Sequence, residues 1–170
     1  MLPLHKFADI RVAAECCILA DGKILLQKRP ADSTNFPNYW TLPGGHIDEM
    51  EDPLTSIVRE VFEETGIKIP VEDVELKVTA INHHIDKYQV WVVYGFLATL
   101  KNELPAISSF EGECQWFSLE AVKEMKEIFP PIAIYLNHIV DLKSGLLHMS
   151  GEWEKATLVK KHTWVVSARK

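Results

Sequence analysis

The sequence predicts a mixed α/β sandwich, in which helices cover both faces of a β-sheet. Three observations predict this fold class: a β-hairpin signal near the N-terminus, one amphipathic helix after it, and later strands that alternate with helical segments. The chain has 170 residues, the length of one domain, and contains no repeat, low-complexity tract or linker. We therefore expect one domain over residues 1–170, with residues 145–170 as a C-terminal extension.

The first elements are the hairpin and a long loop. Residues 11–20 have the composition of a strand, Asp21-Gly22 is a turn signal, and residues 23–28 supply the returning strand. Residues 30–46 contain three prolines and end near two adjacent glycines. We therefore expect a loop that finishes in a tight turn.

The clearest helix follows this loop. Asp52 is a suitable N-cap, Pro53 fits the first helical position, and Gly66 fits the position just after the last turn. Between them, apolar side chains recur at the spacing of one helix face: Leu54, Ile57, Val58, Val61 and Phe62. This stripe should face a core.

The second half of the chain alternates between strand and helix signals, which place strands at 74–82, 88–100 and 114–117 and helices at 119–128 and 132–143. The strand at 88–100 is mostly apolar, so we expect it at the centre of the sheet. His83 and His84 should lie in the loop before it. Pro130-Pro131 should break the chain between the two helices. The last 25 residues are mixed and carry no assignment.

Charge and composition exclude several classes of protein. The chain has 18 Lys and Arg against 24 Asp and Glu, a net charge of −6, so a broad nucleic-acid polymer or anionic membrane surface is not an expected partner. Its three cysteines fit neither a zinc site nor a disulfide framework. The longest apolar run, Val90–Leu100, is about half a membrane span. We therefore expect a soluble, cytoplasmic protein.

A group of carboxylates on the predicted helix is the first chemical signal. Glu60, Glu63 and Glu64 project from one side of the helix, where like charges repel. Hard divalent cations such as Mg²⁺ prefer such oxygen ligands and share them with phosphates. Arg59 can pair with Glu63 or with Glu51 and hold part of the group in place. From spacing alone, an acidic solvated face remains the alternative.

The complete spacing pattern resembles a known family. Gly45, Glu51 and the segment from Arg59 to Ile67 match the Nudix box at every specified position. The chain therefore resembles the MutT-like Nudix hydrolases. The resemblance extends to residues 25–30, 40–45 and 113–119 and covers about residues 10–140.

The resemblance implies an α/β/α sandwich with a mixed sheet, and Mg²⁺- or Mn²⁺-dependent hydrolysis of a nucleoside diphosphate linked to another group. It implies metal ligation by four groups: the carboxylates of Glu60, Glu63 and Glu64 and the carbonyl of Gly44. Glu51 would support the metal shell through water, and Arg59 would orient the neighbouring carboxylates.

The resemblance leaves the general base open among three glutamates: Glu60, Glu111 and Glu113. It places Arg29 against the substrate phosphates, a role that suits a guanidinium fork, with a solvated strand end as the alternative. Gly45 would let the backbone approach the ligand. Trp40 and Tyr39 offer aromatic faces on which a base can stack, and packing beneath the loop is the alternative.

The substrate class follows less directly. Ala133 lacks the amide that base-selective relatives carry in a similar segment, which weakens a preference for 8-oxo-dGTP. The absence of other subgroup marks favours a nucleoside triphosphate, cleaved to a nucleoside monophosphate and pyrophosphate. ADP-ribose or a nucleotide sugar is the alternative substrate, and a non-catalytic nucleotide-sensing module is the alternative class. A homodimer through residues 145–170 also remains open.

Overall fold

The structure is a computed structural model that describes residues 9–107, 112–155 and 157–166. Within these residues, one mixed sheet contains nine strands, and its main path runs β3-β2-β1-β6-β5-β8-β9. The strands are β1 (Asp9–Ala20), β2 (Lys23–Lys28), β3 (Trp40–Thr41), β4 (Gly44–His46), β5 (Val74–His84), β6 (Gln89–Thr99), β7 (Glu113–Ser118), β8 (Leu146–Glu154) and β9 (Thr157–Val166). Off the main path, β4 pairs with β1 and β7 pairs with β2.

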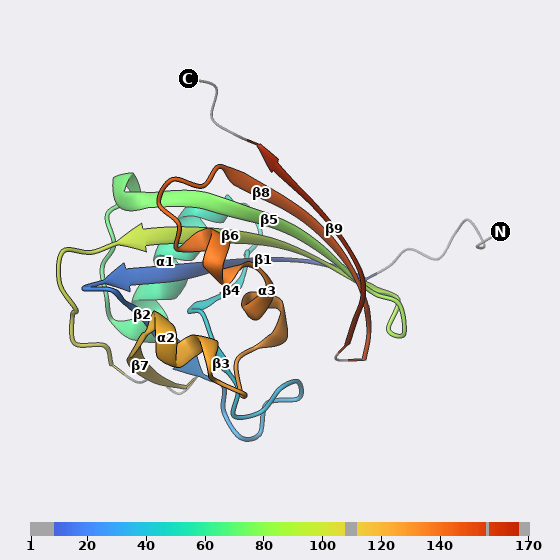
Figure 1. Cartoon of the computed structure of the whole chain (residues 1–170), viewed down its shortest axis with the longest axis horizontal. Coiled ribbons are helices and arrows are strands. Elements are labelled where there is room, and N and C mark those ends of the chain that lie inside the picture. Colours follow the sequence, from blue (N-terminus) through green and yellow to red (C-terminus); the bar gives the residue numbers. More distant parts are fainter. Residues whose placement is uncertain (1–8, 108–111, 156, 167–170) are drawn as a thin grey trace.

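Helices lie on both faces of this sheet, as the sequence predicts. Figure 1 shows α1 (Pro53–Thr65) behind the sheet and α3 (Pro130–Ile139) in front of it, with the short α2 (Leu119–Lys123) beside β7. Two adjacent cysteines of β1 mark the two layers. Cys16 is buried in the cluster that contains α1, and Cys17 is buried in the cluster that contains α3. Both therefore act as small apolar core residues.

The caps of α1 are those that the sequence predicts. The Asp52 carboxylate accepts hydrogen bonds from the backbone N–H groups of Leu54 and Thr55 at 2.9 and 3.0 Å. Gly66 adopts the left-handed conformation with φ 71°. The apolar stripe is confirmed at Ile57 and Val61, which are fully buried. It is wrong at Phe62, whose side chain is 46% exposed.

Tertiary pairing changes the helices that follow. The helix predicted at 119–128 ends at Lys123, because the backbone at 127–129 pairs with β3 instead. The Trp40 N–H donates to the Glu127 carbonyl at 2.7 Å, and the Phe129 N–H donates to the Trp40 carbonyl at 2.8 Å. The next helix includes Pro130 and Pro131 in its first turn, where proline is tolerated.

The predicted strands are confirmed in type and order, and β6 lies in the middle of the sheet. The placement of His83 and His84 in a loop is wrong, since both belong to β5 and pair with β6. The sequence also missed β8 and β9. β8 runs parallel to β5, and β9 forms an antiparallel edge strand. The homodimer through residues 145–170 stays a prediction.

Trp153 connects β8 to β5 through a buried hydrogen bond. Its side chain is 2% exposed and its indole N–H donates to the Asn82 side-chain oxygen at 2.9 Å.

Among the described residues, the helices are all too short or too polar to cross a membrane.

Two substitutions on α1 test its packing. Ile57→Ala removes a fully buried side chain from the core, so we expect the free energy of unfolding to fall by about 2 to 5 kcal/mol. Phe62→Ala on the same helix is the matched control. The Phe62 side chain is 46% exposed, so its removal should lower the free energy of unfolding by much less. Urea unfolding of both variants gives the two values, and equal losses would contradict the observed orientation of α1.

Candidate active site

Arg59 is the centre of the carboxylate group on α1. Its guanidinium forms a bidentate pair with Glu51, at 2.9 Å from Nε and 2.8 Å from Nη2. Its Nη1 also donates to Glu60 at 2.9 Å and to Glu63 at 3.1 Å. Arg59 thus contacts both predicted partners, Glu51 and Glu63, at once. These hydrogen bonds raise the pKa of Arg59 and lower the pKa of Glu51.

Gly44 and Gly45 bring the backbone of β4 against this group. The Gly44 N–H donates to the Glu64 carboxylate at 2.7 Å. A Cβ atom on Gly44, where φ is 147°, would lie 2.2 Å from the Ala14 carbonyl oxygen. A Cβ atom on Gly45 would lie 2.7 Å from the carboxylate carbon of Glu60. Gly44 therefore requires glycine, and a side chain at Gly45 would displace the Glu60 carboxylate, which fits the close approach that the sequence predicts.

The donor set has the chemistry of a site for a hard divalent cation. Carboxylates of Glu60, Glu63 and Glu64 lie on one helix beside the backbone of Gly44, and all supply oxygen. In the described ranges, no three acidic, His or Cys side chains are arranged as a ready metal shell. Nη1 of Arg59 donates to both Glu60 and Glu63. A cation held by these two carboxylates would have to replace that contact.

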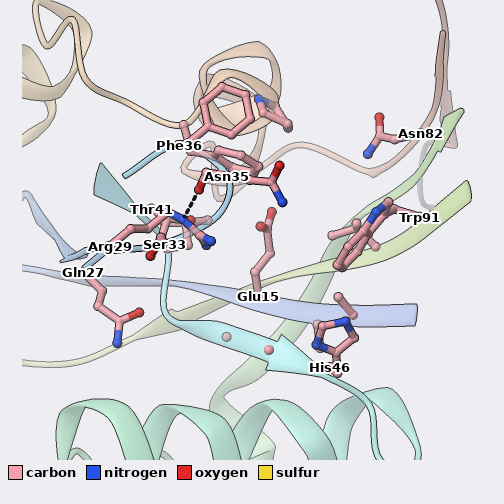
Figure 2. Close-up of a pocket in the computed structure, with 18 of the residues that line it drawn as sticks. Glu15, Gln27, Arg29, Ser33, Asn35, Phe36, Thr41, His46, Asn82 and Trp91 are labelled. Carbon is pink, nitrogen blue, oxygen red and sulfur yellow. Dashed lines mark hydrogen bonds between the residues drawn. The ribbon is translucent and has the colours of Figure 1, made fainter. Parts of the chain in front are cut away.

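A cavity of about 620 Å³ opens beside these residues, within the usual size of a small-molecule site. Its lining includes Glu64, Gly44 and Gly45 from α1 and β4, and Asn82 and Trp153 from β5 and β8. Figure 2 shows polar and aromatic side chains from several strands and from the loop after β2 pointing into this space. Two buried atoms of its lining, Gln27 Nε2 and His84 Nδ1, have no hydrogen-bond partner within the described part of the chain.

The remaining predicted site residues fall into two sets. Arg29 lines the cavity and donates from Nε to the Asn35 carbonyl at 3.1 Å. Trp40 is absent from the lining and packs edge-on against Phe117, with ring centroids 4.7 Å apart. Glu113 is exposed on β7, also outside the lining. Glu111 lies outside the described residues.

Sequence reasoning missed a carboxylate in the cavity itself. Glu15 lies on β1 and accepts a hydrogen bond from the Tyr135 hydroxyl of α3. Burial raises the pKa of Glu15 to about 7, and the Tyr135 hydrogen bond opposes that shift. The signal was present in the sequence: Glu15 is the one charged residue between Val12 and Ala20, in an otherwise apolar strand.

Comparison with known proteins settles the family. The family model for the NUDIX domain matches residues 9–136. The chain belongs to the Nudix family. It is therefore a Nudix hydrolase, one of a class of enzymes that cleave pyrophosphate bonds and generally use a divalent metal ion.

Individual relatives agree with this assignment. "Uncharacterized Nudix hydrolase YvcI" of Bacillus subtilis is 29% identical over 140 residues, which is 78% of this chain and 80% of that protein. A crystal structure titled as a MutT protein from Bacillus halodurans has a TM-score of 0.76 and 23% identity, covering 90% of this chain and 97% of its own. The NUDIX domain of Shewanella oneidensis NrtR, solved with ADP ribose, has a TM-score of 0.64 and 22% identity, covering 77% and 88%. These two structures show the shared fold.

The pKa of Glu15 predicts a pH-dependent stability. In the unfolded chain this carboxyl has its ordinary pKa of 4.5, and in the folded protein about 7. Between these values the folded state binds more protons, so its stability falls as pH rises from 5 to 8 by up to about 3 kcal/mol. Glu15→Gln removes this contribution while keeping an acceptor for Tyr135.

Urea unfolding of the wild type and of Glu15→Gln at pH 5 and pH 8 measures the effect. We expect the wild type to lose stability relative to the variant between the two pH values. Equal changes in both proteins would show that Glu15 titrates normally.

Proposed function

We propose that this Nudix hydrolase cleaves a nucleoside triphosphate to a nucleoside monophosphate and pyrophosphate, with Mg²⁺ or Mn²⁺ as cofactor. The observation that supports the proposal is the carboxylate group of α1, which is ordered by Arg59 and of which Glu64 lines the cavity. The cavity volume of about 620 Å³ suits a nucleotide, and its lining offers aromatic and amide side chains for a base.

The proposed metal site consists of the carboxylates of Glu60, Glu63 and Glu64 and the carbonyl of Gly44. The bound cation would supply charge neutralisation at the phosphates and a lower pKa of the attacking water. Arg59 keeps the carboxylates oriented through its contact with Glu51. Glu64 is 4% exposed and tied to the Gly44 N–H, so it is the most rigid of the three.

The reaction requires one protein carboxylate to take a proton. As water forms its bond to a phosphorus, the bridging P–O bond breaks, the proton passes to the carboxylate, and pyrophosphate leaves with the electron pair. Glu60 has the position for this role, since its carboxyl lies against Gly45 and its side chain is 13% exposed. Glu113, at the start of β7, and Glu111 remain the alternatives.

Arg29 is the proposed phosphate-binding residue of the cavity. It lies at the end of β2, lines the cavity, and uses Nε to hold the loop through the Asn35 carbonyl. Its two terminal nitrogens remain suited to a bidentate contact with phosphate oxygens. Gly45 would give the substrate access to the backbone, whereas the packing of Trp40 against Phe117 favours a structural role for that residue.

A panel of substrates tests the proposal. Nucleoside triphosphates, their deoxy and oxidised forms, ADP-ribose, NADH, nucleotide sugars and diadenosine polyphosphates are each incubated with Mg²⁺ and, separately, with EDTA. We expect metal-dependent release of pyrophosphate from triphosphates. Turnover of ADP-ribose alone would favour the alternative substrate, for which the NrtR structure with ADP ribose gives a precedent in this fold. Binding without turnover would favour a nucleotide-sensing module.

Glu63→Gln tests the proposed metal site. The side chain is 58% exposed and contacts Arg59, so the variant should fold like the wild type. Loss of a metal ligand should lower kcat by about a hundredfold or more. Glu72→Gln, an exposed change outside the site, is the matched control and should keep full activity. Full activity of Glu63→Gln would exclude the assigned ligand set.

Two further variants identify the base. If Glu60 takes the proton, Glu60→Gln should lower kcat by a factor of about 100 to 10,000 and remove the acidic limb of the pH–rate profile, while Glu113→Gln keeps that limb. The opposite pattern would assign the role to Glu113. If both variants keep the acidic limb, Glu111 is the remaining candidate for the base.

A further inference from the structure

Glu15 stands in the cavity away from the carboxylates of α1. Figure 2 shows its side chain rising from β1 into the middle of the space, with Phe36 and Asn35 on one side and Trp91 on the other. Every other charged group of β1 lies before Val12, at the exposed start of the strand. Glu15 is therefore the one carboxylate that β1 presents to a ligand.

One carboxylate oxygen of Glu15 is held in place by a residue of α3. The hydroxyl of Tyr135, a residue only 2% exposed, donates to Glu15 Oε1. The tightest neighbours of a Cβ atom at Gly95 would be Val78 Cβ at 3.2 Å and Ile139 Cδ1 at 3.3 Å, so this glycine lets α3, which carries Tyr135, pack closely on the sheet. The carboxyl is thus fixed before any ligand arrives.

The hydrogen-bonding capacity of this carboxyl is mostly unused. A carboxylate offers about four acceptor positions. Among the described residues, Tyr135 is the one whose hydrogen bond to Glu15 is observed, and it uses a single position. Glu15 is partly exposed and lines the cavity, so a ligand that displaces water from it should bring N–H donors in its place.

The walls around Glu15 are suited to a flat, aromatic ligand. Phe36 is held by edge contacts with Tyr39 and Phe129, at centroid distances of 5.3 and 5.0 Å. The Trp91 indole N–H donates to Gln89 at 2.8 Å, and its ring is held by His46 at a centroid distance of 5.1 Å and by the Arg11 guanidinium at 5.6 Å, so it forms a fixed aromatic wall of the cavity. Aromatic side chains beside fixed hydrogen-bonding groups are the features that bind nucleobases.

We propose that Glu15, positioned by Tyr135, selects the base of the nucleotide by accepting hydrogen bonds from its N–H donors. The edge that fits is that of guanine, which presents a ring N–H next to an exocyclic amine. Hypoxanthine lacks the amine, and adenine places a ring acceptor beside its amine, where it would face the carboxylate oxygens. This proposal rests on the proposed nucleotide substrate and adds the choice of base.

Binding of nucleoside monophosphates tests the proposal separately from catalysis, because they contain no pyrophosphate bond. The Kd values of GMP, IMP and AMP are measured by calorimetry in the presence of Mg²⁺ at pH 8, above the pKa of about 7 of Glu15, where the carboxylate acts as an acceptor only. We expect the wild type to bind GMP at least about tenfold more tightly than IMP or AMP. Equal affinities, or no binding of any of the three, would overturn the proposal even if triphosphates are hydrolysed.

Variants assign the preference to Glu15. Glu15→Gln keeps the size of the side chain but replaces one acceptor with a donor, so its GMP-to-AMP preference should fall to about unity. Tyr135→Phe should reduce the same preference by a smaller factor, since the carboxyl loses its anchor but keeps its charge. Glu124→Gln, an exposed change outside the cavity, is the control and should leave it unchanged. An unchanged preference in a folded Glu15→Gln variant would overturn the assignment.

Discussion

The backbone of Gly44 lies so close to β1 that no side chain fits between them, and the backbone of Gly45 lies directly against the Glu60 carboxylate. This approach brings the Gly44 N–H onto Glu64 and the Gly45 Cα against Glu60. It therefore joins the helix that carries the acidic group to the strand that borders the cavity. The caps, the core packing of α1 and the β1–β4 pairing all serve to maintain this single contact.

The charge around Arg59 explains why the region between the Gly44–Gly45 backbone and the carboxylates of α1 suits a cation. Four carboxylates lie within 3.5 Å of one guanidinium: Asp48, Glu51, Glu60 and Glu63. One positive charge cannot balance four negative ones, and Glu60 is largely shielded from water, at 13% exposure. Water screens Asp48 and Glu63, which are 71% and 58% exposed, so the excess negative charge is felt most at Glu60. A divalent cation with phosphate ligands of its own would relieve that repulsion while leaving Arg59 on Glu51.

How far the sequence predicts this arrangement depends on whether the signal is local. The caps at Asp52 and Gly66 and the spacing of the Nudix box involve neighbouring residues, and they gave α1 and its acidic side chains correctly. The end of α2 depends on Trp40, far away in the sequence, so the helical pattern beyond Lys123 was misleading. β8 is stabilised by its pairing with β5, and no local sequence pattern predicts this pairing.

The same limit applies to the site. Arg59 and its partners follow from spacing along one helix, whereas the cavity is assembled from residues that only the fold brings together. Glu15 and Tyr135 are 120 positions apart, and their hydrogen bond follows from the packing of α3 against the sheet. A lone acidic residue within an apolar strand is the sequence signal that points to such a position.

The register between β1 and β4 links Glu15, the proposed base-selecting residue, to Gly44 of the proposed metal site. Glu15 on β1 is the direct partner of Gly44 on β4. A slip of one residue in this pairing would turn Glu15 out of the cavity and would also move the Gly44 N–H away from Glu64. The group proposed to select the base and the group proposed to hold the metal are thus fixed by one set of backbone hydrogen bonds. Binding energy gained at the base can then hold the phosphates in position over the carboxylates, where it contributes to the rate of hydrolysis as well as to affinity.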